Sequence, residues 1–286
     1  MKLTEYDISH PHEAVVARTE RITSEDTAEV RHITLNISDA TFNYLEGQSI
    51  GVLVPGPHSF GNTHHMRLYS IANARQGEDQ NMAELSICVR RCFYIDEVSG
   101  ERHPGVASNF LCDRKPGDTI RIVGPYGRQF LAPRDPACNM LMIGVGTGIA
   151  PFRAFLKHIY SERQDWQGKV RLFYGASSGL DQLYLNDRND DLTLYYDEET
   201  FEAFQALSPR PHLDEPVDMA SAVKAHAEEV WAMIQNDKTY VYVAGLMRLE
   251  EQMDEVLSEM AGSETAWKEK KQELIESRRW STLFYA

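Results

Sequence analysis

The first half of the chain carries short runs in which apolar and polar residues alternate, separated by turn residues. Ile33, Leu35 and Ile37 alternate with polar neighbours, and the same alternation runs from Leu85 to Val89. A period of two is typical of a strand with one buried face. Six strands are predicted, with no long helix between them, at residues 14–23, 28–37, 47–54, 66–72, 83–91 and 118–123. Such a set favours an antiparallel β-barrel.

After Pro133 the pattern changes, because short apolar runs now alternate with segments of helical periodicity. Apolar runs predict buried strands at residues 139–143, 170–174 and 240–244, and each run is followed by a glycine. Apolar residues repeat at helical spacing over residues 220–235 and 246–260, which predicts two packing helices. The second half is therefore predicted to be an α/β domain with a parallel sheet, whose ligand edge lies at the carboxyl ends of the strands.

A chain of 286 residues is long enough for two domains, each with its own core. The proline-containing segment 131–137 is the natural boundary, so we expect domains at 1–134 and 135–286. The formal net charge is -14, and most of the acidity belongs to the second domain. An acidic protein repels the phosphate backbone, which argues against nucleic acid as a partner.

The longest apolar stretch, residues 140–152, is interrupted by glycines and is shorter than the roughly 20 residues that span a bilayer. We therefore expect a cytoplasmic protein without membrane insertion, as a monomer or weak dimer. The chain has four cysteines and no C-x-x-C pair, which predicts reduced structural thiols and no metal site, at Cys88, Cys92, Cys112 and Cys138.

A glycine-rich segment, Gly144-Val-Gly-Thr-Gly-Ile-Ala-Pro151, follows a predicted strand and opens a predicted helix. Backbone N–H groups at such a turn, together with the helix N-terminus, favour a pyrophosphate. Pro151 suits the first turn of a helix. The glycine spacing differs from G-x-G-x-x-G, so a turn that merely packs against a neighbour is an open alternative.

Several segments occur in a characteristic order from about Glu46 to the end of the chain. They are Arg67-Leu-Tyr-Ser-Ile-Ala72, Gly105-Val-Ala-Ser-Asn-Phe-Leu-Cys112, Lys115-Pro-Gly-Asp118, Gly146-Thr-Gly-Ile-Ala-Pro-Phe-Arg153, Tyr240-Val-Tyr-Val-Ala-Gly-Leu246 and a terminal Tyr285. In these segments the chain resembles the plant-type ferredoxin–NADP⁺ reductase family. The resemblance implies an antiparallel FAD-binding β-barrel followed by a parallel-sheet, Rossmann-like NAD(P)-binding domain, with the isoalloxazine in the cleft between them.

The resemblance also implies roles toward FAD. Arg67 would pair with the FAD pyrophosphate, Tyr69 would stack on one flavin face, and Ser70 would act as a catalytic residue near flavin N5. Tyr94 would stack on the adenine, although a surface tyrosine in a loop is an equally weighted alternative. Ser108, at a short helix N-terminus, would contact phosphate oxygens. Further cofactor-binding positions that the resemblance implies are Leu68, Cys88, Arg90, Val106 and Ala107.

For the nicotinamide dinucleotide, the resemblance implies contacts from Gly146, Thr147, Gly148 and Gly245. Tyr285, the second implied catalytic residue, would cover the flavin face on which nicotinamide must land, so it would have to move for hydride transfer.

The family reads the adenosine 2′-phosphate with Ser-Arg and Lys-x-Tyr, where this chain has Ser208-Pro209 and Pro216-Val-Asp218. We therefore expect NADH to serve at least as well as NADPH, because Asp218 suits ribose hydroxyls and repels a phosphate. Two alternatives stay open. Arg210 could still contact a 2′-phosphate, and Asp218 could be an ordinary acid at a helix start.

The implied function is an FAD-dependent oxidoreductase that takes a hydride from NADH or NADPH and passes single electrons to a ferredoxin or flavodoxin. The chain has no cysteine cluster for its own iron–sulfur centre, so an external carrier is required. A reductase component of an oxygenase is an alternative with the same chemistry. A flavin-binding sensor or subunit without turnover is a second alternative, because the chain departs from the family at Ala107, Ala244 and Leu283 and carries the extra residue Ala286.

Overall fold

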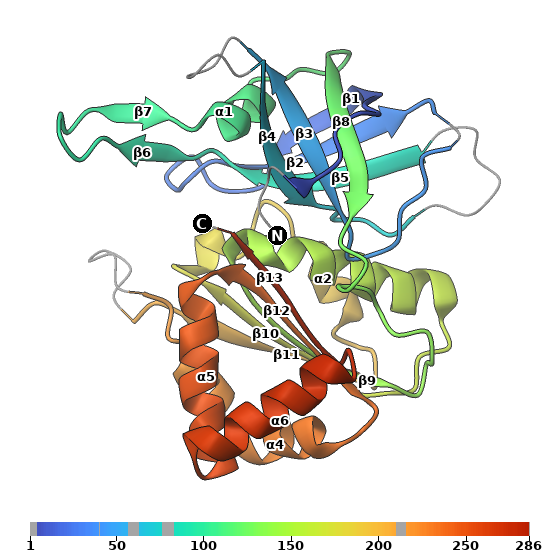
Figure 1. Cartoon of the computed structure of the whole chain (residues 1–286), viewed down its shortest axis with the longest axis vertical. Coiled ribbons are helices and arrows are strands. Elements are labelled where there is room, and N and C mark those ends of the chain that lie inside the picture. The colour runs from blue at the N-terminus through green and yellow to red at the C-terminus, as the bar shows by residue number, and fades with distance from the viewer. Residues whose placement is uncertain (1–4, 40, 57–62, 76–82, 210–215, 286) are drawn as a thin grey trace. The chain divides into compact units, whose positions relative to one another are not determined.

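The computed structural model describes residues 5–39, 41–56, 63–75, 83–209 and 216–285 (Figure 1). The chain folds into two compact units, the N-terminal unit Met1–Leu131 and the C-terminal unit Ala132–Ala286. Within the described residues, no helix has both the length and the apolar character needed to cross a membrane. Arg210 and Ala286, named above from the sequence, lie outside the described residues.

The N-terminal unit is built on a six-stranded antiparallel sheet with the order β4-β3-β8-β1-β2-β5. A bridge between Ile71 and Ile87 joins the end of β4 to β5, so the two edge strands meet. This confirms the predicted antiparallel barrel. Its strands are β1 (His12–Arg21), β2 (Val30–Ile37), β3 (Ser49–Pro55), β4 (His64–Ser70), β5 (Ala83–Arg90) and β8 (Thr119–Tyr126).

The alternating residues of β2 and β5 form much of the barrel core. Ile33 lies opposite Ile87, and Leu35 lies opposite Leu85, and all four side chains are fully buried. Burying a side chain of this size contributes about 1.5–3 kcal/mol relative to leaving it exposed. The period of two in the sequence therefore corresponds to the inner face of the barrel.

A small hairpin and a short helix lie outside the barrel strands. The hairpin pairs β6 (Phe93–Ile95) with β7 (Arg102–Pro104), and α1 (Val106–Cys112) follows it directly. Figure 1 shows β6 and β7 extending away from the barrel of this unit. The sequence pattern did not predict these two strands, because all three residues of β6 are exposed and leave no periodic apolar face.

The C-terminal unit contains a five-stranded parallel sheet with the order β11-β10-β9-β12-β13, which confirms the predicted α/β fold. β9 is the central strand, between β10 and β12. The two edge strands were not among the predicted buried runs. The strands are β9 (Asn139–Val145), β10 (Val170–Ala176), β11 (Phe201–Leu207), β12 (Thr239–Leu246) and β13 (Trp280–Tyr285).

Helices cover both faces of this sheet (Figure 1). On one face Phe155 of α2 packs against Tyr242 of β12, with ring centroids 5.1 Å apart. On the other face α3 to α6 share one apolar core with alternate residues of the strands. The helices are α2 (Ile149–Leu156), α3 (Met219–Lys224), α4 (Ala227–Gln235), α5 (Arg248–Ala261) and α6 (Glu264–Glu276).

The single helix predicted over residues 220–235 is wrong, because the chain breaks between α3 and α4. At the break the N–H of His226 donates to the carbonyl of Val223, a tightened last turn. The His226 ring packs on Phe204 of β11, with centroids 3.9 Å apart. Helical periodicity continues across the break, so the apolar pattern alone gave no sign of it.

No disulfide joins any of the cysteines in the described chain. Cys88, Cys112 and Cys138 are buried, and burial raises the pKa of the Cys112 thiol to about 12. These three are inert structural thiols, as predicted. Cys92 is exposed at the base of the β6–β7 hairpin, so it does not share their packing role.

Candidate functional site

Strand β4 carries the proposed flavin contacts of the N-terminal unit. Arg67 is exposed, and its guanidinium donates one hydrogen bond to the Met66 carbonyl at 2.9 Å. Tyr69 is half-buried against the barrel core, and burial raises the pKa of its phenol. Because side chains alternate along a strand, Arg67 and Tyr69 share one face of β4, while Leu68 and Ser70 share the other.

Helix α1 places Ser108 next to the base of the hairpin. The Ser108 hydroxyl accepts a hydrogen bond from the Cys92 N–H at 3.1 Å and donates to the Gly105 carbonyl at 3.3 Å. No side chain caps the start of this helix. The hydroxyl thus fastens α1 to the strand end, and the first-turn N–H groups, rather than the hydroxyl, suit a phosphate oxygen.

Tyr94 lies in β6 with more than half of its surface exposed. Its ring stacks on His103 of β7, with centroids 5.2 Å apart and planes 28° apart. One face of the phenol ring is therefore supported by the hairpin itself. A flat aromatic ligand such as adenine fits the other face, by offset stacking.

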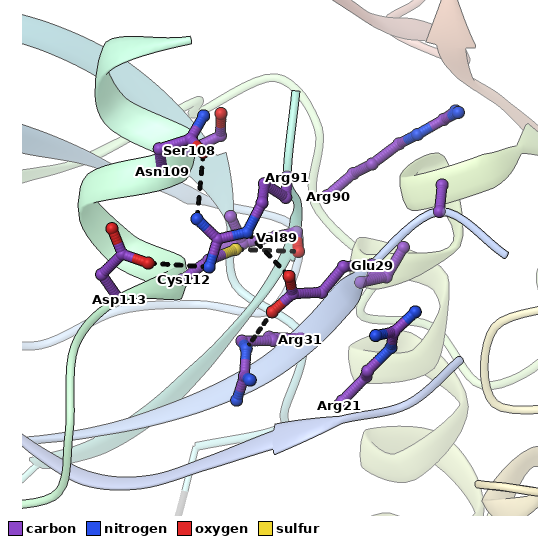
Figure 2. A network of polar contacts seen from close by, with 12 residues as sticks. Arg21, Glu29, Arg31, Val89, Arg90, Arg91, Ser108, Asn109, Cys112 and Asp113 are labelled. Atoms are coloured by element: carbon purple, nitrogen blue, oxygen red, sulfur yellow. Dashed lines mark hydrogen bonds and ion pairs between the residues drawn. The ribbon is translucent and has the colours of Figure 1, made fainter. Parts of the chain in front are cut away.

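An ion-pair network joins the ends of β2 and β5 to α1 (Figure 2). The Arg91 guanidinium donates to Glu29 at 2.7 Å, to Asn109 at 3.0 Å and to Asp113 at 2.8 Å. Arg31 donates to the other oxygen of Glu29 at 2.5 Å. Charge-assisted bonds of this kind are the stronger class, so the network fixes α1 and the hairpin base against the barrel.

We expect Arg91→Met to lower the free energy of unfolding by about 2–3 kcal/mol, because it removes one of the two charged donors to Glu29 and the charged donor to Asp113. Urea denaturation of the FAD-bound protein measures this loss. Arg18→Met is the matched control, because Arg18 is 61% exposed and pairs with Glu20 only at 3.7 Å. We expect Arg18→Met to lower the free energy of unfolding by less than about 1 kcal/mol. An equal loss in both variants would contradict the stabilising role of the Arg91 network.

The same network gives a pH dependence. Burial alone raises the pKa of Glu29, but hydrogen bonds from Arg91 and Arg31 outweigh burial and leave that pKa below its usual 4.5. A carboxyl with a lowered folded-state pKa stabilises the fold above its unfolded-state pKa and loses that contribution as pH falls. The stability difference between the parent and Arg91→Met should therefore be constant above about pH 5 and shrink at more acidic pH.

In the C-terminal unit, a glycine turn follows the central strand. Gly146–Gly148 forms one 3-10 turn between β9 and α2, and no side chain caps the start of either helical segment. Gly146 has φ +58°, and a Cβ there would meet nothing within 4 Å. A Cβ on Gly148 would lie 2.2 Å from the Ala244 carbonyl oxygen. The turn therefore packs tightly against β12 on one side and is open on the other.

Two tyrosines, from strands on opposite sides of β9, bind this turn. The Tyr174 hydroxyl, on β10, donates to the Gly146 carbonyl at 3.2 Å. The Tyr285 hydroxyl, on β13, accepts from Thr147 Oγ1 at 2.9 Å and donates to the Val145 carbonyl at 3.2 Å. Gly245, with φ +151°, is the next-to-last residue of β12 and lies beside Val145. The structure thus brings together Gly146, Thr147, Gly148, Gly245 and Tyr285, which the sequence had named.

Of the three residues expected near the adenosine 2′ position, the structure describes Ser208 and Asp218. Ser208 is buried directly after β11. Asp218 is the N-cap of α3: its Oδ1 accepts from the Ser221 N–H at 2.9 Å, and hydrogen bonding by Ser221 lowers the pKa of the Asp218 carboxyl. Asp218 therefore has the helix-start role that was the alternative interpretation.

The donors present suit the two cofactors. The exposed Arg67 guanidinium and the uncapped start of α1 are groups that bind the phosphates of FAD. The ring of Tyr94, which His103 supports on one side, suits the adenine. An uncapped helix start beside a glycine with positive φ is a set that binds a dinucleotide pyrophosphate. Sequence reasoning missed Arg91 and Tyr174. The signal for Tyr174 was a hydroxyl that follows two apolar residues in a fully buried strand, where it needs a partner.

Comparison with known proteins covers both units. Residues 14–130 match the family model "Oxidoreductase FAD-binding domain", and residues 142–255 match "Oxidoreductase NAD-binding domain". The chain is 36% identical over 278 residues to the ferredoxin–NADP reductase of Thermosynechococcus vestitus, covering 95% of this chain and 72% of that one. It is 34% identical over 276 residues to the ferredoxin–NADP reductase of Spirulina sp, covering 94% and 93%.

The fold agrees with that of a solved relative. The structure of ferredoxin–NADP⁺ reductase from Plasmodium falciparum superposes with a TM-score of 0.73 at 22% identity, covering 99% of each chain. Identity at that level shows the fold alone, whereas the two sequence relatives exceed 30% identity over nearly the whole chain. The chain belongs to the ferredoxin–NADP reductase family.

Proposed function

We propose that this protein is an FAD-dependent oxidoreductase that transfers a hydride from NAD(P)H to FAD and passes electrons singly to a ferredoxin. The observation that carries the proposal is the Gly146–Gly148 turn, which leaves the start of α2 uncapped at the carboxyl edge of a parallel sheet. That edge is where open α/β sheets bind dinucleotides. Bound FAD supplies the redox chemistry, since a flavin accepts two electrons and releases them one at a time.

Within this proposal the N-terminal unit binds FAD. Arg67 pairs with the diphosphate, and Tyr69 lies against the isoalloxazine. Tyr94 offers its free ring face to adenine. Ser70 positions the reacting end of the flavin with its hydroxyl, at the end of β4. The remaining contacts come from Leu68, Cys88, Arg90, Val106, Ala107 and Ser108, of which Cys88 and Ala107 are buried and Arg90 is exposed.

The C-terminal unit binds the nicotinamide dinucleotide, with its pyrophosphate at Gly146, Thr147 and Gly148. Tyr285 then has two roles. Its hydroxyl closes the turn through Thr147 and the Val145 carbonyl. In this proposal its ring also covers the place that nicotinamide takes. Displacing the ring breaks two hydrogen bonds worth about 1 kcal/mol each, a cost that nicotinamide binding must exceed.

The preference between NADH and NADPH depends on the residues expected near the adenosine 2′ position, which are Ser208, Asp218 and Arg210. The named relatives use NADP, and we propose that this chain accepts NADPH while NADH serves at least as well. Asp218 supports that proposal, because a carboxylate with a lowered pKa stays charged and repels a 2′-phosphate. The carboxylate would accept a ribose hydroxyl of NADH in place of that phosphate.

The carrier is a small one-electron protein. Both sequence relatives are ferredoxin–NADP reductases, so we propose ferredoxin, with flavodoxin as the alternative. An acidic protein of net charge -14 meets an acidic carrier only through locally positive surface, so binding should depend on salt. We propose that the protein works in the cytoplasm, where NAD(P)H is available, as a monomer or weak dimer.

The test of the proposed function is flavin content followed by reduction. The purified protein should be yellow, with one FAD released per chain on denaturation, and stopped-flow absorbance should show the flavin bleach on mixing with NADPH or NADH. Adding a ferredoxin should then restore the oxidised spectrum under anaerobic conditions. Absence of FAD would end the flavoprotein proposal, and FAD without bleaching by either dinucleotide would favour the sensor alternative.

A further inference from the structure

Tyr174 lies fully buried in β10 and bonds to two segments of backbone. Its hydroxyl donates to the Gly146 carbonyl at 3.2 Å and accepts from the Leu183 N–H at 2.9 Å. The ring therefore links the glycine turn after β9 to the segment that follows β10. A phenol that both donates and accepts uses its full ordinary hydrogen-bonding capacity.

The Gly146 carbonyl is fixed by two donors. Besides Tyr174, the N–H of Ile149 donates to it and closes the 3-10 turn. In a trans peptide the carbonyl and the next N–H point in opposite directions. A carbonyl fixed toward Tyr174 therefore directs the Thr147 N–H away from Tyr174. The turn is open beside this peptide, since a Cβ on Gly146 would meet nothing within 4 Å.

Glycine makes this orientation depend on hydrogen bonds. The direction of the peptide between Gly146 and Thr147 is set by ψ of Gly146 and φ of Thr147, and glycine, which lacks a Cβ, restricts its ψ least. Without the bonds to its carbonyl, this peptide rotates more readily than one that follows another residue. After such a rotation the carbonyl dipole would face the bound anion in place of the N–H, an unfavourable interaction.

The other end of the Tyr174 link is itself anchored. Tyr184 follows Leu183, and the Arg153 guanidinium of α2 lies 4.8 Å from the centre of its ring. Arg153 also pairs with Asp191, through Nε at 3.0 Å and through Nη2 at 2.5 Å. Contacts from Arg153 thus join the segment from Leu183 to Asp191 to α2, the helix that follows the glycine turn, so Tyr174 bonds to a segment that is itself anchored.

We propose that Tyr174 is a positioning residue that locks the Gly146–Thr147 peptide with its N–H toward the pyrophosphate of the bound dinucleotide. The proposal rests on the proposed function, and it deepens it by assigning a residue of β10 to the phosphate contact. It concerns binding of the pyrophosphate and leaves the hydride transfer step unchanged. The adenosine end of the ligand, near β11 and α3, is outside its influence.

The test compares Tyr174→Phe with Tyr160→Phe. Phenylalanine keeps the ring and removes only the hydroxyl. Tyr160 is the matched control, because its buried hydroxyl bonds Thr200 Oγ1 at 2.8 Å and no part of the glycine turn. Tyr174→Phe should raise the Kd for ADP-ribose and the KM for NADPH by on the order of tenfold, with kcat and FAD content unchanged. In Tyr160→Phe the Kd for ADP-ribose, the KM for NADPH, kcat and the FAD content should all equal those of the parent.

AMP distinguishes positioning from general stability, since it carries adenosine without a pyrophosphate. Its Kd should be the same in the parent and in Tyr174→Phe. A rise in Kd that is equal for AMP and ADP-ribose, or absent for both, would refute the proposal while the proposed function stands. A parent that is reduced by neither dinucleotide would remove the proposed function and this inference with it.

Amide hydrogen exchange of the parent protein gives an independent check that needs no variant. The Thr147 amide should exchange rapidly in the free protein and become protected with ADP-ribose, because its N–H points outward. Protection of that amide before ligand is added would show that the N–H points into the protein, and the proposal would be wrong. Unchanged rapid exchange in saturating ADP-ribose would count against it equally.

Discussion

Replacing Gly148 by alanine is expected to lower kcat/KM for NADPH and NADH by at least about 10²-fold, while FAD stays bound. The added Cβ would lie 2.2 Å from the Ala244 carbonyl oxygen and 2.6 Å from its carbonyl carbon. Both are backbone atoms of β12, so the turn itself must shift. A misplacement of about 1 Å in a positioning element can cost 10²-fold in rate. Steady-state kinetics and the released flavin measure the two halves of this expectation.

Gly179→Ala is the matched control. Gly179 lies in a short turn after β10, and a Cβ there would meet nothing within 4 Å. Its kinetics should equal those of the parent, and far-UV circular dichroism of both variants should separate a local shift from unfolding. A Gly148→Ala protein with parental kcat/KM would show that the dinucleotide binds elsewhere.

Ser70→Ala should slow flavin reduction by on the order of 10²-fold at saturating NADPH, with FAD content unchanged. The proposed role of the hydroxyl is a hydrogen bond at the reacting end of the flavin, and removing one such preorganised donor typically costs 10²–10³ in rate. Binding survives because Arg67 and Tyr69 remain on the opposite face of β4. Stopped-flow absorbance of the flavin gives the rate directly.

Ser86→Ala provides the comparison within the same barrel. Ser86 is buried on β5 and its hydroxyl lies 3.3 Å from that of Thr34, so its loss should affect stability only. Its reduction rate should equal that of the parent. If Ser70→Ala is reduced at the parental rate, the proposed catalytic role of Ser70 is wrong, although FAD binding by β4 is untouched by that result.

The strongest sequence signals were those with a physical period. Alternation of Ile33, Leu35 and Ile37 predicted the inner face of the barrel, and all three side chains are fully buried. The apolar run at 139–143 predicted the central strand β9 and the glycine turn after it. These elements bury a continuous face, and burial is what an apolar pattern records.

The parts that the sequence did not reveal depend on contacts between distant residues. The β6–β7 hairpin is exposed, and its order comes from pairing such as Tyr94 with His103. Helix α6 has only Trp267 and Leu274 buried, too narrow a stripe to read as amphipathic. The Arg91 network joins residues that are far apart in the chain, so no local sequence pattern predicts it.

The central place of β9 has a consequence for how the chain is made. One edge of β9 pairs with β10 soon after it in sequence, but the other edge pairs with β12, which begins only at Thr239. At about 5–20 residues per second, translation needs roughly 5–20 s to extend from Val145 to Thr239. Throughout that interval the apolar edge of β9 is an open template for pairing. Until β12 has been made, this edge of the C-terminal unit is therefore exposed to pairing with other chains.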